Sequence, residues 1–386
     1  MRIAVVHSRY TAAQPSGENV VVDAQVAALR RAGHDVLAVV RETDVVSRDR
    51  LYPLKAAVSA AQLGGPSPEA DLEAFRPDVV HVHNLFPNWG TAWLRRWGPR
   101  TVATLHNVRY ACAAATFFRD GHECRLCPER GSHHALVHRC YRGSPVATAP
   151  LAFATRGGGS HDALLRHAAR LLVLNDSARD TAARVARGAV QVLPNFAPPL
   201  PVPDDGAGGP ETGERWIYVG RLTPEKGVLW LVENLPDGAL LDVVGDGPQL
   251  AEVERAVAQR GGAVRLHPGL PRSEVGRLLR SARGLVLPSM WQEGLPTVTL
   301  ESLACGTPVV ASSTCVAADR VTRDGAGAVF DPAAGRPGLA AAMDEVVARG
   351  DVGRRAAHDL HERAYSERAW VEQVEAVYAE VAAARA

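Results

Sequence analysis

Short runs of β-branched and aliphatic residues alternate along this chain with longer amphipathic segments. Strands that alternate with helices predict a parallel sheet covered on both faces. In the first half the expected strands cover residues 3–7, 36–40, 79–83, 102–106, 171–174 and 190–193. The rhythm restarts after residue 214, with expected strands at 216–219, 240–244, 264–267, 284–288 and 308–311. The pattern therefore predicts an α/β protein with two doubly wound, Rossmann-like domains.

A segment rich in proline and glycine, residues 194–210, separates the two patterns and is typical of a linker. We expect a domain over 1–195, a linker over 196–214, a second domain over 215–366 and a C-terminal helix over 367–386. Doubly wound sheets bind ligands beyond the carboxyl ends of their strands. Two such domains are expected to face each other across a cleft that can close on a substrate. The final helix could pack on either domain.

Length and composition, 386 residues with 46% hydrophobic and 22% charged, are those of a soluble globular protein of about two domains. Apolar runs stay far below the roughly 20 residues that a membrane helix needs, so no span is expected. The first residues run directly into an expected strand without the features of a signal peptide. We therefore expect a cytoplasmic protein with reduced thiols.

Charge is unevenly distributed, although the net charge is only +1. Residues 1–195 carry 24 Lys and Arg against 16 Asp and Glu, whereas residues 196–386 carry 19 against 26. The basic half would suit an anionic acceptor or peripheral contact with the inner face of a membrane, or it could attract the acidic half across a cleft. Solvated faces of two domains explain the asymmetry equally well. Arginine is not interleaved with aromatic residues, so no nucleic-acid partner is expected.

The first candidate site follows the first strand of the second half, in the segment Gly220-Arg-Leu-Thr-Pro-Glu-Lys-Gly227. Among 43 basic residues the chain has only two lysines, Lys55 and Lys226, so a lysine at 226 stands out. A guanidinium at Arg221 and an ammonium at Lys226 on one strand-to-helix turn suit a diphosphate. The start of the helix adds amide donors. Surface charges on a turn are the alternative interpretation.

A second candidate site begins where another expected strand ends, at Ser289. Pro296 suits the first helical position, and the amides of Thr297 and Val298 then point toward an anion. Glu293 with Gly294 lies in the preceding loop, and Glu301 lies on the second helical turn. A carboxylate beside a diphosphate is repelled unless it accepts hydrogen bonds from hydroxyls. We therefore expect Glu293 at a sugar and Glu301 at a ribose, although such glutamates are common near helix starts.

These motifs together resemble the retaining glycosyltransferases of family 4, which have the two-domain GT-B architecture. The resemblance covers nearly the whole chain and includes Pro15-Ser-Gly-Glu-Asn19, Thr104-Leu-His-Asn107, Leu193-Pro-Asn195, Gly245-Asp-Gly-Pro248 and Ala304-Cys-Gly-Thr-Pro-Val-Val310. It implies that Arg221 and Lys226 bind the diphosphate of a nucleotide-sugar donor, Glu293 its sugar and Glu301 its ribose. It also implies that Gly17 approaches the phosphates from across the cleft and that His106 lies near the reacting sugar. By themselves, a loop glycine and a strand-end histidine are often structural.

Such an enzyme transfers a sugar from a nucleoside-diphosphate sugar to an acceptor hydroxyl with retention. Charge grows on the leaving β-phosphate, so fixed cations and amides give the largest stabilisation. The chain has no Asp-x-Asp motif, so no cofactor is expected to be required, and Arg221 and Lys226 would replace a divalent ion. The acceptor is open between a glycan or lipid-linked intermediate of surface polysaccharide assembly and a small secondary metabolite. Donor sugar, base and oligomeric state are not fixed by the sequence.

Four cysteines lie in an insertion at about 108–145, namely Cys112, Cys124, Cys127 and Cys140. They could hold a structural zinc ion. Only one Cys-x2-Cys pair is present, and nearby histidines (His122, His133, His134, His138) could replace a cysteine. Reduced core cysteines or a redox pair are the alternatives.

Two other functional classes are weighed against the transferase. An NAD-dependent oxidoreductase needs a glycine fingerprint after the first strand, which residues 7–17 lack. A non-catalytic module that binds nucleic acid through the cysteine loop would leave the two glutamates unexplained.

Overall fold

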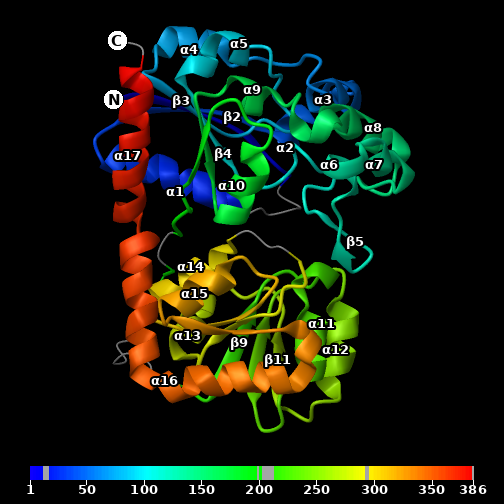
Figure 1. Ribbon diagram of the computed structural model, residues 1–386, viewed down its shortest axis with the longest axis vertical. Coiled ribbons are helices and arrows are strands. Elements are labelled where there is room, and N and C mark those ends of the chain that lie inside the picture. The colour runs from blue at the N-terminus through cyan, green and yellow to red at the C-terminus, as the bar shows by residue number, and fades with distance from the viewer. Residues whose placement is uncertain (12–16, 198–199, 202–212, 292–294, 385–386) are drawn as a thin grey trace. The chain divides into compact units, whose positions relative to one another are not determined.

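The computed structural model describes residues 1–11, 17–197, 200–201, 213–291 and 295–384. The chain forms two compact units, shown as a ribbon in Figure 1. The N-terminal unit comprises Met1–Phe117, Cys124–Asn195 and Trp370–Ala386. The C-terminal unit comprises Phe118–Glu123 and Phe196–Ala369.

The N-terminal unit is built around a parallel sheet that has six strands within the described residues, in the order β2-β1-β3-β4-β7-β8. These strands are β1 (Arg2–Arg9), β2 (Asp35–Glu42), β3 (Val79–Asn84), β4 (Thr101–Leu105), β7 (Arg170–Val173) and β8 (Ala189–Val192). Its helices are α1 (Gly17–Arg31), α2 (Thr43–Val46), α3 (Tyr52–Ala60), α4 (Glu69–Phe75), α5 (Leu94–Trp97), α6 (Leu126–Arg130), α7 (His133–Val137), α8 (Pro145–Ala154), α9 (Ala163–His167), α10 (Asp176–Ala183) and most of α17 (Glu367–Ala383).

The C-terminal unit has a second parallel sheet, also of six strands where the chain is described, in the order β11-β10-β9-β12-β13-β14. Its strands are β9 (Arg215–Val219), β10 (Leu240–Val244), β11 (Val264–His267), β12 (Leu285–Leu287), β13 (Val309–Ser312) and β14 (Gly327–Phe330). Its helices are α11 (Val228–Asn234), α12 (Leu250–Ala258), α13 (Arg272–Ser281), α14 (Thr297–Ala304), α15 (Ala317–Arg323) and α16 (Gly335–Ala364). A short antiparallel hairpin pairs β5 (Phe118–Arg119) with β6 (His122–Glu123).

Alternation along each strand separates the core of the C-terminal unit into two layers. Trp216 and Tyr218 on β9 pack with residues of α11 and α12, whereas Ile217 packs with residues of α13, α14 and α15. Successive strand side chains point to opposite faces, so a strand buried on both faces reads as a continuous apolar run. The prediction of two doubly wound α/β domains is confirmed, and β14 is a strand that the sequence pattern did not indicate.

The C-terminal helix α17 packs on the N-terminal unit, which resolves the choice that the sequence left open. Tyr378 Oη lies 2.6 Å from His81 Nδ1 on β3. Two further contacts hold the helix. Glu375 lies 2.8 Å from Nε2 of His34, which directly precedes β2, and Glu380 accepts from Arg170 at the start of β7 at 2.8 Å. Buried side chains of α17, among them Trp370 and Tyr378, thus add to the core of the N-terminal unit.

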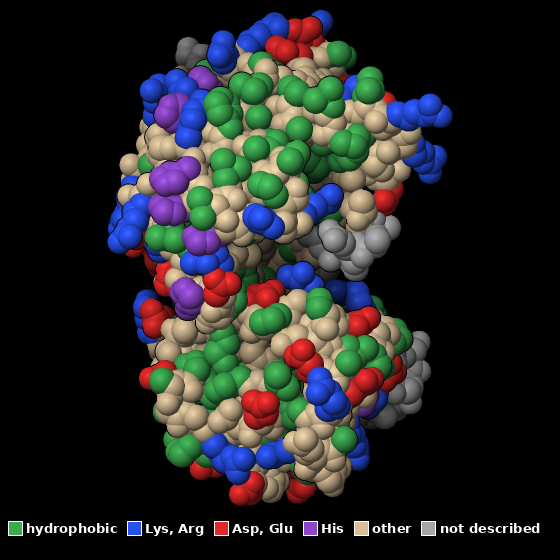
Figure 2. All heavy atoms as spheres, turned by 90° about the vertical axis from the view of Figure 1, so that its right-hand side faces the viewer, with side chains coloured by type: hydrophobic (Ala, Val, Ile, Leu, Met, Phe, Trp, Pro, Cys, Tyr) green, Lys and Arg blue, Asp and Glu red, His purple; other side chains and the backbone are tan. Residues whose placement is uncertain are grey.

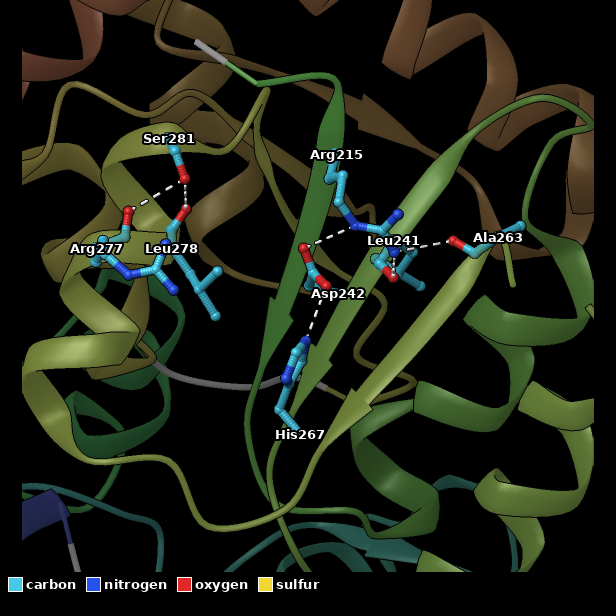
Figure 3. Close-up of polar contacts among 8 residues, drawn as sticks. All are labelled: Arg215, Leu241, Asp242, Ala263, His267, Arg277, Leu278 and Ser281. Atoms are coloured by element: carbon cyan, nitrogen blue, oxygen red, sulfur yellow. Dashed lines mark hydrogen bonds and ion pairs between the residues drawn. The ribbon is translucent and has the colours of Figure 1, made fainter. Parts of the chain in front are cut away.

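A buried polar network joins three neighbouring strands of the C-terminal unit (Figure 3). Asp242 on β10 accepts a hydrogen bond from Arg215 Nε on β9 at 2.9 Å, and its other oxygen lies 2.9 Å from His267 Nε2 on β11. The guanidinium also donates to the carbonyls of Leu241 and Ala263. The Asp242 side chain is only 8% exposed and that of Arg215 only 18%. Neither charge is well solvated, so each is stabilised in the interior mainly by the other.

We predict that Asp242→Ala lowers the free energy of unfolding by about 3 kcal/mol, because removal of one partner leaves a poorly solvated guanidinium without its counter-charge. The matched control is Asp237→Ala, which removes a carboxylate that is 88% exposed and paired with Arg336. That surface pair should contribute less than about 1 kcal/mol. Urea unfolding of both variants measures the difference, and equal effects would contradict the role given to Asp242.

Candidate functional site

The strand order of the C-terminal sheet defines where a ligand would lie. Strands β9 and β12 are neighbours, yet β9 connects to β10 on one side while β12 continues to β13 on the other. In doubly wound sheets the crevice beyond the carboxyl ends of two such strands is the usual ligand site. Both candidate motifs follow these two strands, one after Val219 and the other after Leu287.

The loops that follow β9 and β12 contact each other directly. The amide of Met290 donates to the carbonyl of Glu225 at 2.9 Å. Gly227 has a φ of 71°, and a Cβ at this position would lie 2.0 Å from the carbonyl oxygen of Pro288. Only glycine allows this close approach of the two backbones. The residue that ends the predicted phosphate motif is therefore needed to bring the two motifs together.

A second loop supports the backbone of Arg221. The amide of Leu222 donates to the carbonyl of Asp246 at 2.9 Å, and Tyr218 Oη donates to the carbonyl of Arg221 at 2.8 Å. Gly245, at φ 152°, would place a Cβ 1.9 Å from the carbonyl oxygen of Gly220. The Gly245-Asp-Gly segment is thus a turn that fixes the Arg221 segment, in agreement with its interpretation as a turn.

The Arg221 side chain extends into solvent, where it can reach a ligand. It is 70% exposed and lies 3.7 Å from Glu225, a carboxylate that is held by a hydrogen bond from the hydroxyl of Thr223 at 2.7 Å. Lys226 is half-buried on the adjoining 3-10 turn, Pro224–Lys226. The sequence analysis did not single out Glu225, although its spacing of four residues from Arg221 is the signal for such a pair.

The helix that carries the second motif starts one residue later than predicted. Pro296 is the N-cap of α14, and Thr297 is its first residue. The first amides of a helix have no partner within it, so Thr297 and Val298 offer donors at this end. Glu293, expected at the donor sugar, and the neighbouring Gly294, expected at the same donor site, lie outside the described residues.

Glu301 is a buried carboxylate with a cationic partner. Arg272 on α13 donates to its Oε1 at 2.7 Å, and the Glu301 side chain is only 7% exposed. A carboxylate offers about four lone-pair sites, so this ion pair leaves capacity for further donors. Arg272 was missed by the sequence analysis because it is 29 residues away from Glu301 in the chain.

In the N-terminal unit, four histidines lie close together on the neighbouring strands β1 and β3 and directly after β4. His81 and His83 lie on one face of β3 with ring centroids 4.1 Å apart, and His83 stacks on His106 at 5.3 Å. His7 on β1 lies 6.4 Å from His83. Burial lowers the pKa of His81 and of His106 to about 3, and it holds the pKa of His83 well below its usual range. All three rings are therefore neutral near pH 7.

Two polar contacts hold the ring of His106. The amide nitrogen of Asn195 lies 3.5 Å from His106 Nδ1. His83 Nδ1 lies 3.0 Å from His106 Nε2. Asn195 itself accepts from Gln25 Nε2 at 3.1 Å. Both ring nitrogens of His106 therefore have protein partners, and the longer contact, to Asn195, is the one that a substrate hydroxyl would replace more readily.

A cavity of about 100 Å³ opens beside His106, and its lining includes His83, Arg109, Tyr110 and Asp162. The buried carboxylate of Asp162 is committed to structure, because it accepts from the amides of Leu164 and Leu165 at the start of α9. The ring hydroxyl of Tyr110 is buried, and within the described residues it has no hydrogen-bond partner. The lining of the cavity thus combines the neutral rings of His83 and His106 with a tyrosine and a cationic side chain, Arg109.

Glu18 is a titratable residue that the sequence analysis did not single out. It lies at the start of α1, directly after Gly17, which the structure places as the first residue of that helix. Burial raises the pKa of its carboxyl to about 7, while Arg109 and a hydrogen bond with Asn84 act in the opposite direction. Asn84 ends β3, so Glu18 reaches the same strand end as the histidines.

Burial raises the pKa of the Cys127 thiol to about 11, and the nearby thiols of Cys112, Cys140 and Cys124 act in the same direction. The four cysteines of the insertion therefore lie near one another. All are free thiols. Among the described residues, no three His, Cys, Asp or Glu side chains form a group that could hold a metal ion. The structural zinc ion, one of the three alternatives for these cysteines, therefore has no ligand set among the described residues. Cys127 instead packs in a small apolar cluster with Ala135, Leu151 and others, as a reduced core cysteine would.

Comparison with known proteins decides the family. Residues 15–199 match the family described as Glycosyltransferase Family 4, and residues 206–367 match Glycosyl transferases group 1. The chain belongs to the family 4 type of glycosyltransferases. This assignment takes the place of the oxidoreductase and nucleic-acid alternatives.

Two curated relatives illustrate the range of the family. The 2-deoxystreptamine N-acetyl-D-glucosaminyltransferase of Streptomyces fradiae is 31% identical over 267 residues, which cover 61% of this chain and 54% of that protein. The alpha-maltose-1-phosphate synthase of Mycolicibacterium smegmatis is 34% identical over 185 residues, with 43% and 48% covered. This chain spans about half the length of these relatives or less.

Solved structures show the same fold over nearly the whole length. Sucrose-phosphate synthase from Thermosynechococcus elongatus aligns over 99% of both chains with a TM-score of 0.67 and 19% identity. HepE from Anabaena, solved in complex with UDP, aligns over 98% of this chain and all of that chain, with a TM-score of 0.61 and 14% identity. The expected GT-B fold is confirmed.

The buried histidines predict that the protein loses stability as the pH falls below 6.5. Unfolded histidines take up protons near pH 6.5, whereas His81, His83 and His106 resist protonation in the folded state. Each of these histidines lowers the free energy of unfolding by up to about 1.4 kcal/mol for every pH unit by which the pH falls, within the range between its unfolded and its folded pKa. Glu18 acts in the opposite direction, because its raised pKa means that the folded state takes up this proton at a higher pH than the unfolded state does. Between pH 4.5 and about 7 it therefore cancels the loss of stability caused by about one histidine.

Urea unfolding from pH 8 to pH 5, followed by tryptophan fluorescence, measures this dependence. His83→Gln should make the slope of unfolding free energy against pH shallower by about one proton, whatever it does to the stability at pH 8. A slope that stays the same in His83→Gln would contradict the buried neutral state of this ring.

Proposed function

We propose that this protein is a retaining glycosyltransferase that moves a sugar from a nucleoside-diphosphate donor to an acceptor hydroxyl. The observation that carries the proposal is that the Arg221–Lys226 turn and the start of α14 follow adjacent strands at the switch point of the C-terminal sheet. This is the place where a parallel sheet binds a phosphate-bearing ligand. The match to a family of glycosyltransferases supports the same assignment.

Charge development on the leaving group explains why cations are needed there. As the bond between the anomeric carbon and the β-phosphate oxygen breaks, negative charge accumulates on the departing nucleoside diphosphate. Arg221, exposed and only loosely paired with Glu225, is free to form a bidentate contact with phosphate oxygens. Lys226 and the amides of Thr297 and Val298 would add fixed positive potential.

The acidic residues are assigned to hydroxyl groups. Glu301 is buried and anchored by Arg272, so its position is well defined for accepting hydrogen bonds from a ribose. Glu293 is proposed at the donor sugar, as the family resemblance implies. In the N-terminal unit, Gly17 is proposed as a phosphate contact and His106 Nδ1 as an acceptor for a sugar hydroxyl, in place of Asn195.

Two kinds of acceptor fit the family. The relative from Streptomyces fradiae is named for 2-deoxystreptamine, a small-molecule acceptor. Another relative, from Bacillus subtilis, is named for teichuronic acid biosynthesis, a polymer pathway. The basic N-terminal half favours an anionic glycan or lipid-linked acceptor of surface polysaccharide assembly over a small metabolite.

Removal of the ammonium group should abolish most activity. We predict that Lys226→Ala lowers the rate of donor hydrolysis or transfer by about a hundredfold or more, because one fixed charge at the leaving group is lost. Glu293→Ala should also lose most activity through the donor sugar. Release of nucleoside diphosphate, measured with a coupled assay, gives both rates.

The chain offers a matched control for this experiment. Lys55→Ala removes the other lysine, which is exposed on α3 and paired with Asp49, and it should leave the rate unchanged. Thermal melting checks that all three variants fold. Normal turnover in both Lys226→Ala and Glu293→Ala would refute the assignment of the donor site.

Stereochemistry and donor can be tested together. A panel of UDP-, GDP- and ADP-sugars, screened by thermal stabilisation of the protein, should identify one base that raises the melting temperature. With that donor, NMR of the product should show the same anomeric configuration as the donor. An inverted product would exclude the retaining mechanism while leaving the transferase assignment in place.

A further inference from the structure

Helix α8 of the N-terminal unit exposes apolar side chains where a surface helix normally exposes polar ones. It contains no charged residue, and its outward positions are Val146, Ala149 and Phe153. Val146 is 81% exposed and Phe153 is 43% exposed. The inner face is fully used, because Leu151 and Ala152 are buried in the local core. The exposed apolar side chains therefore do not contribute to packing within this unit.

The neighbouring segment extends this surface. Helix α7 packs against α8 and exposes Val137, whose side chain is 68% exposed. The connection between the two helices is held on α8 by Tyr141 and Thr148, since the amide of Tyr141 donates to the hydroxyl of Thr148 at 3.1 Å. Figure 2 shows hydrophobic side chains across this side of the N-terminal unit, with charged and His side chains, most of them Lys and Arg, toward its edges.

The chain segment that carries this surface has charged residues of one sign only. Between Glu129 and Asp162 the chain contains no acidic residue, but it contains arginines at positions 130, 139, 142 and 156. Within the part of the chain that the structure describes, neither Arg139 nor Arg142 forms an ion pair, and both are exposed. Arg156 lies 3.9 Å over the ring of Phe153. The positive charges at the edge of the apolar strip are therefore available to an anionic partner.

The backbone at these arginines is strained. Arg139 has a φ of 49° and Arg142 a φ of 54°, a region that glycine or asparagine adopts at lower cost. Each such residue destabilises the fold by about 1 kcal/mol or more. Both positions lie in the connection between α7 (His133–Val137) and α8 (Pro145–Ala154).

Among the helices that the structure describes, none is long and apolar enough to cross a bilayer. A short apolar strip edged by arginines instead has the pattern of a segment that lies in the headgroup region of a membrane. We propose that the surface formed by Val137, Arg139, Arg142, Val146 and Phe153, here called the α8 surface, docks on an anionic lipid bilayer. The valines and the phenylalanine would enter the acyl boundary while the arginines bind lipid phosphates.

The test is co-sedimentation of the full chain with vesicles of phosphatidylcholine alone and of phosphatidylcholine mixed with phosphatidylglycerol. Wild-type protein should bind the anionic vesicles, bind neutral vesicles at least tenfold more weakly, and be released by high salt. Arg139→Gln combined with Arg142→Gln should weaken binding by about thirtyfold, since each basic residue near an anionic surface contributes about tenfold or less. Val146→Asp combined with Phe153→Asp should weaken binding at least as much.

Control variants on the C-terminal unit have matched chemistry. Val352→Asp changes a valine that is 64% exposed on α16, and Arg355→Gln removes an exposed arginine of the same helix. Both should bind vesicles as the wild type does. Equal loss in these controls, no binding of the wild type, or full binding by the α8 variants would overturn the proposal.

A second copy of the chain is the competing occupant of this surface. Light scattering after gel filtration measures the oligomeric state. The lipid proposal would be overturned if the wild type is a dimer that does not bind vesicles and the double variant Val146→Asp with Phe153→Asp is a monomer. Donor hydrolysis in the absence of vesicles should be the same in all these variants. The lipid proposal can therefore fail while the donor site stands, and the donor site can fail while lipid binding stands.

Discussion

In a parallel sheet all strands end at the same edge, and the order of the strands alone determines which loops meet there. In the C-terminal sheet β9 and β12 are adjacent although β10 and β11 separate them in the chain. The turn with Arg221 and Lys226 therefore meets the loop that leads to α14, and a glycine at 227 lets their backbones touch. Without that strand order the cations and the helix start would be separate surface features.

The two units differ in how they treat charge at their strand ends. The C-terminal unit keeps Arg221 exposed and anchors the buried Glu301 with Arg272, so it presents one adaptable cation and one rigid carboxylate. The N-terminal unit buries neutral imidazoles that hydrogen-bond to one another and to Asn195. A charged diphosphate suits the first environment, whereas sugar hydroxyls suit the second, because neutral rings hydrogen-bond without adding net charge.

The same N-terminal unit carries features that donor chemistry does not require. The segment between β4 and β7 contains both the α8 surface and the four cysteines, of which Cys127 and Cys140 pack in a local apolar cluster. Small apolar clusters of this kind can hold up a surface helix whose outer face is itself apolar. This segment thereby supplies an apolar face edged by positive charge on the N-terminal unit.

Much of this organisation follows from the sequence alone. Apolar runs of four to eight residues separated by helical patterns predict parallel strands because only strands buried on both faces lack polar positions. Motifs such as Arg221 to Gly227 are local, so the sequence also indicated the turn and the helix start. The contrast between a basic and an acidic half was likewise visible without coordinates.

Contacts between distant residues were decided only by tertiary structure. Arg272 pairs with Glu301 across 29 residues, and Tyr378 reaches His81 across 297, so no local pattern could reveal either pair. The neutral state of His106 depends on burial, and the exposure of Val146 depends on which face of α8 packs inward. The close spacing of the cysteines suggested a metal, but ligand geometry is set by how the insertion folds. Sequence determines what each segment can form; burial and neighbours determine what each side chain can do.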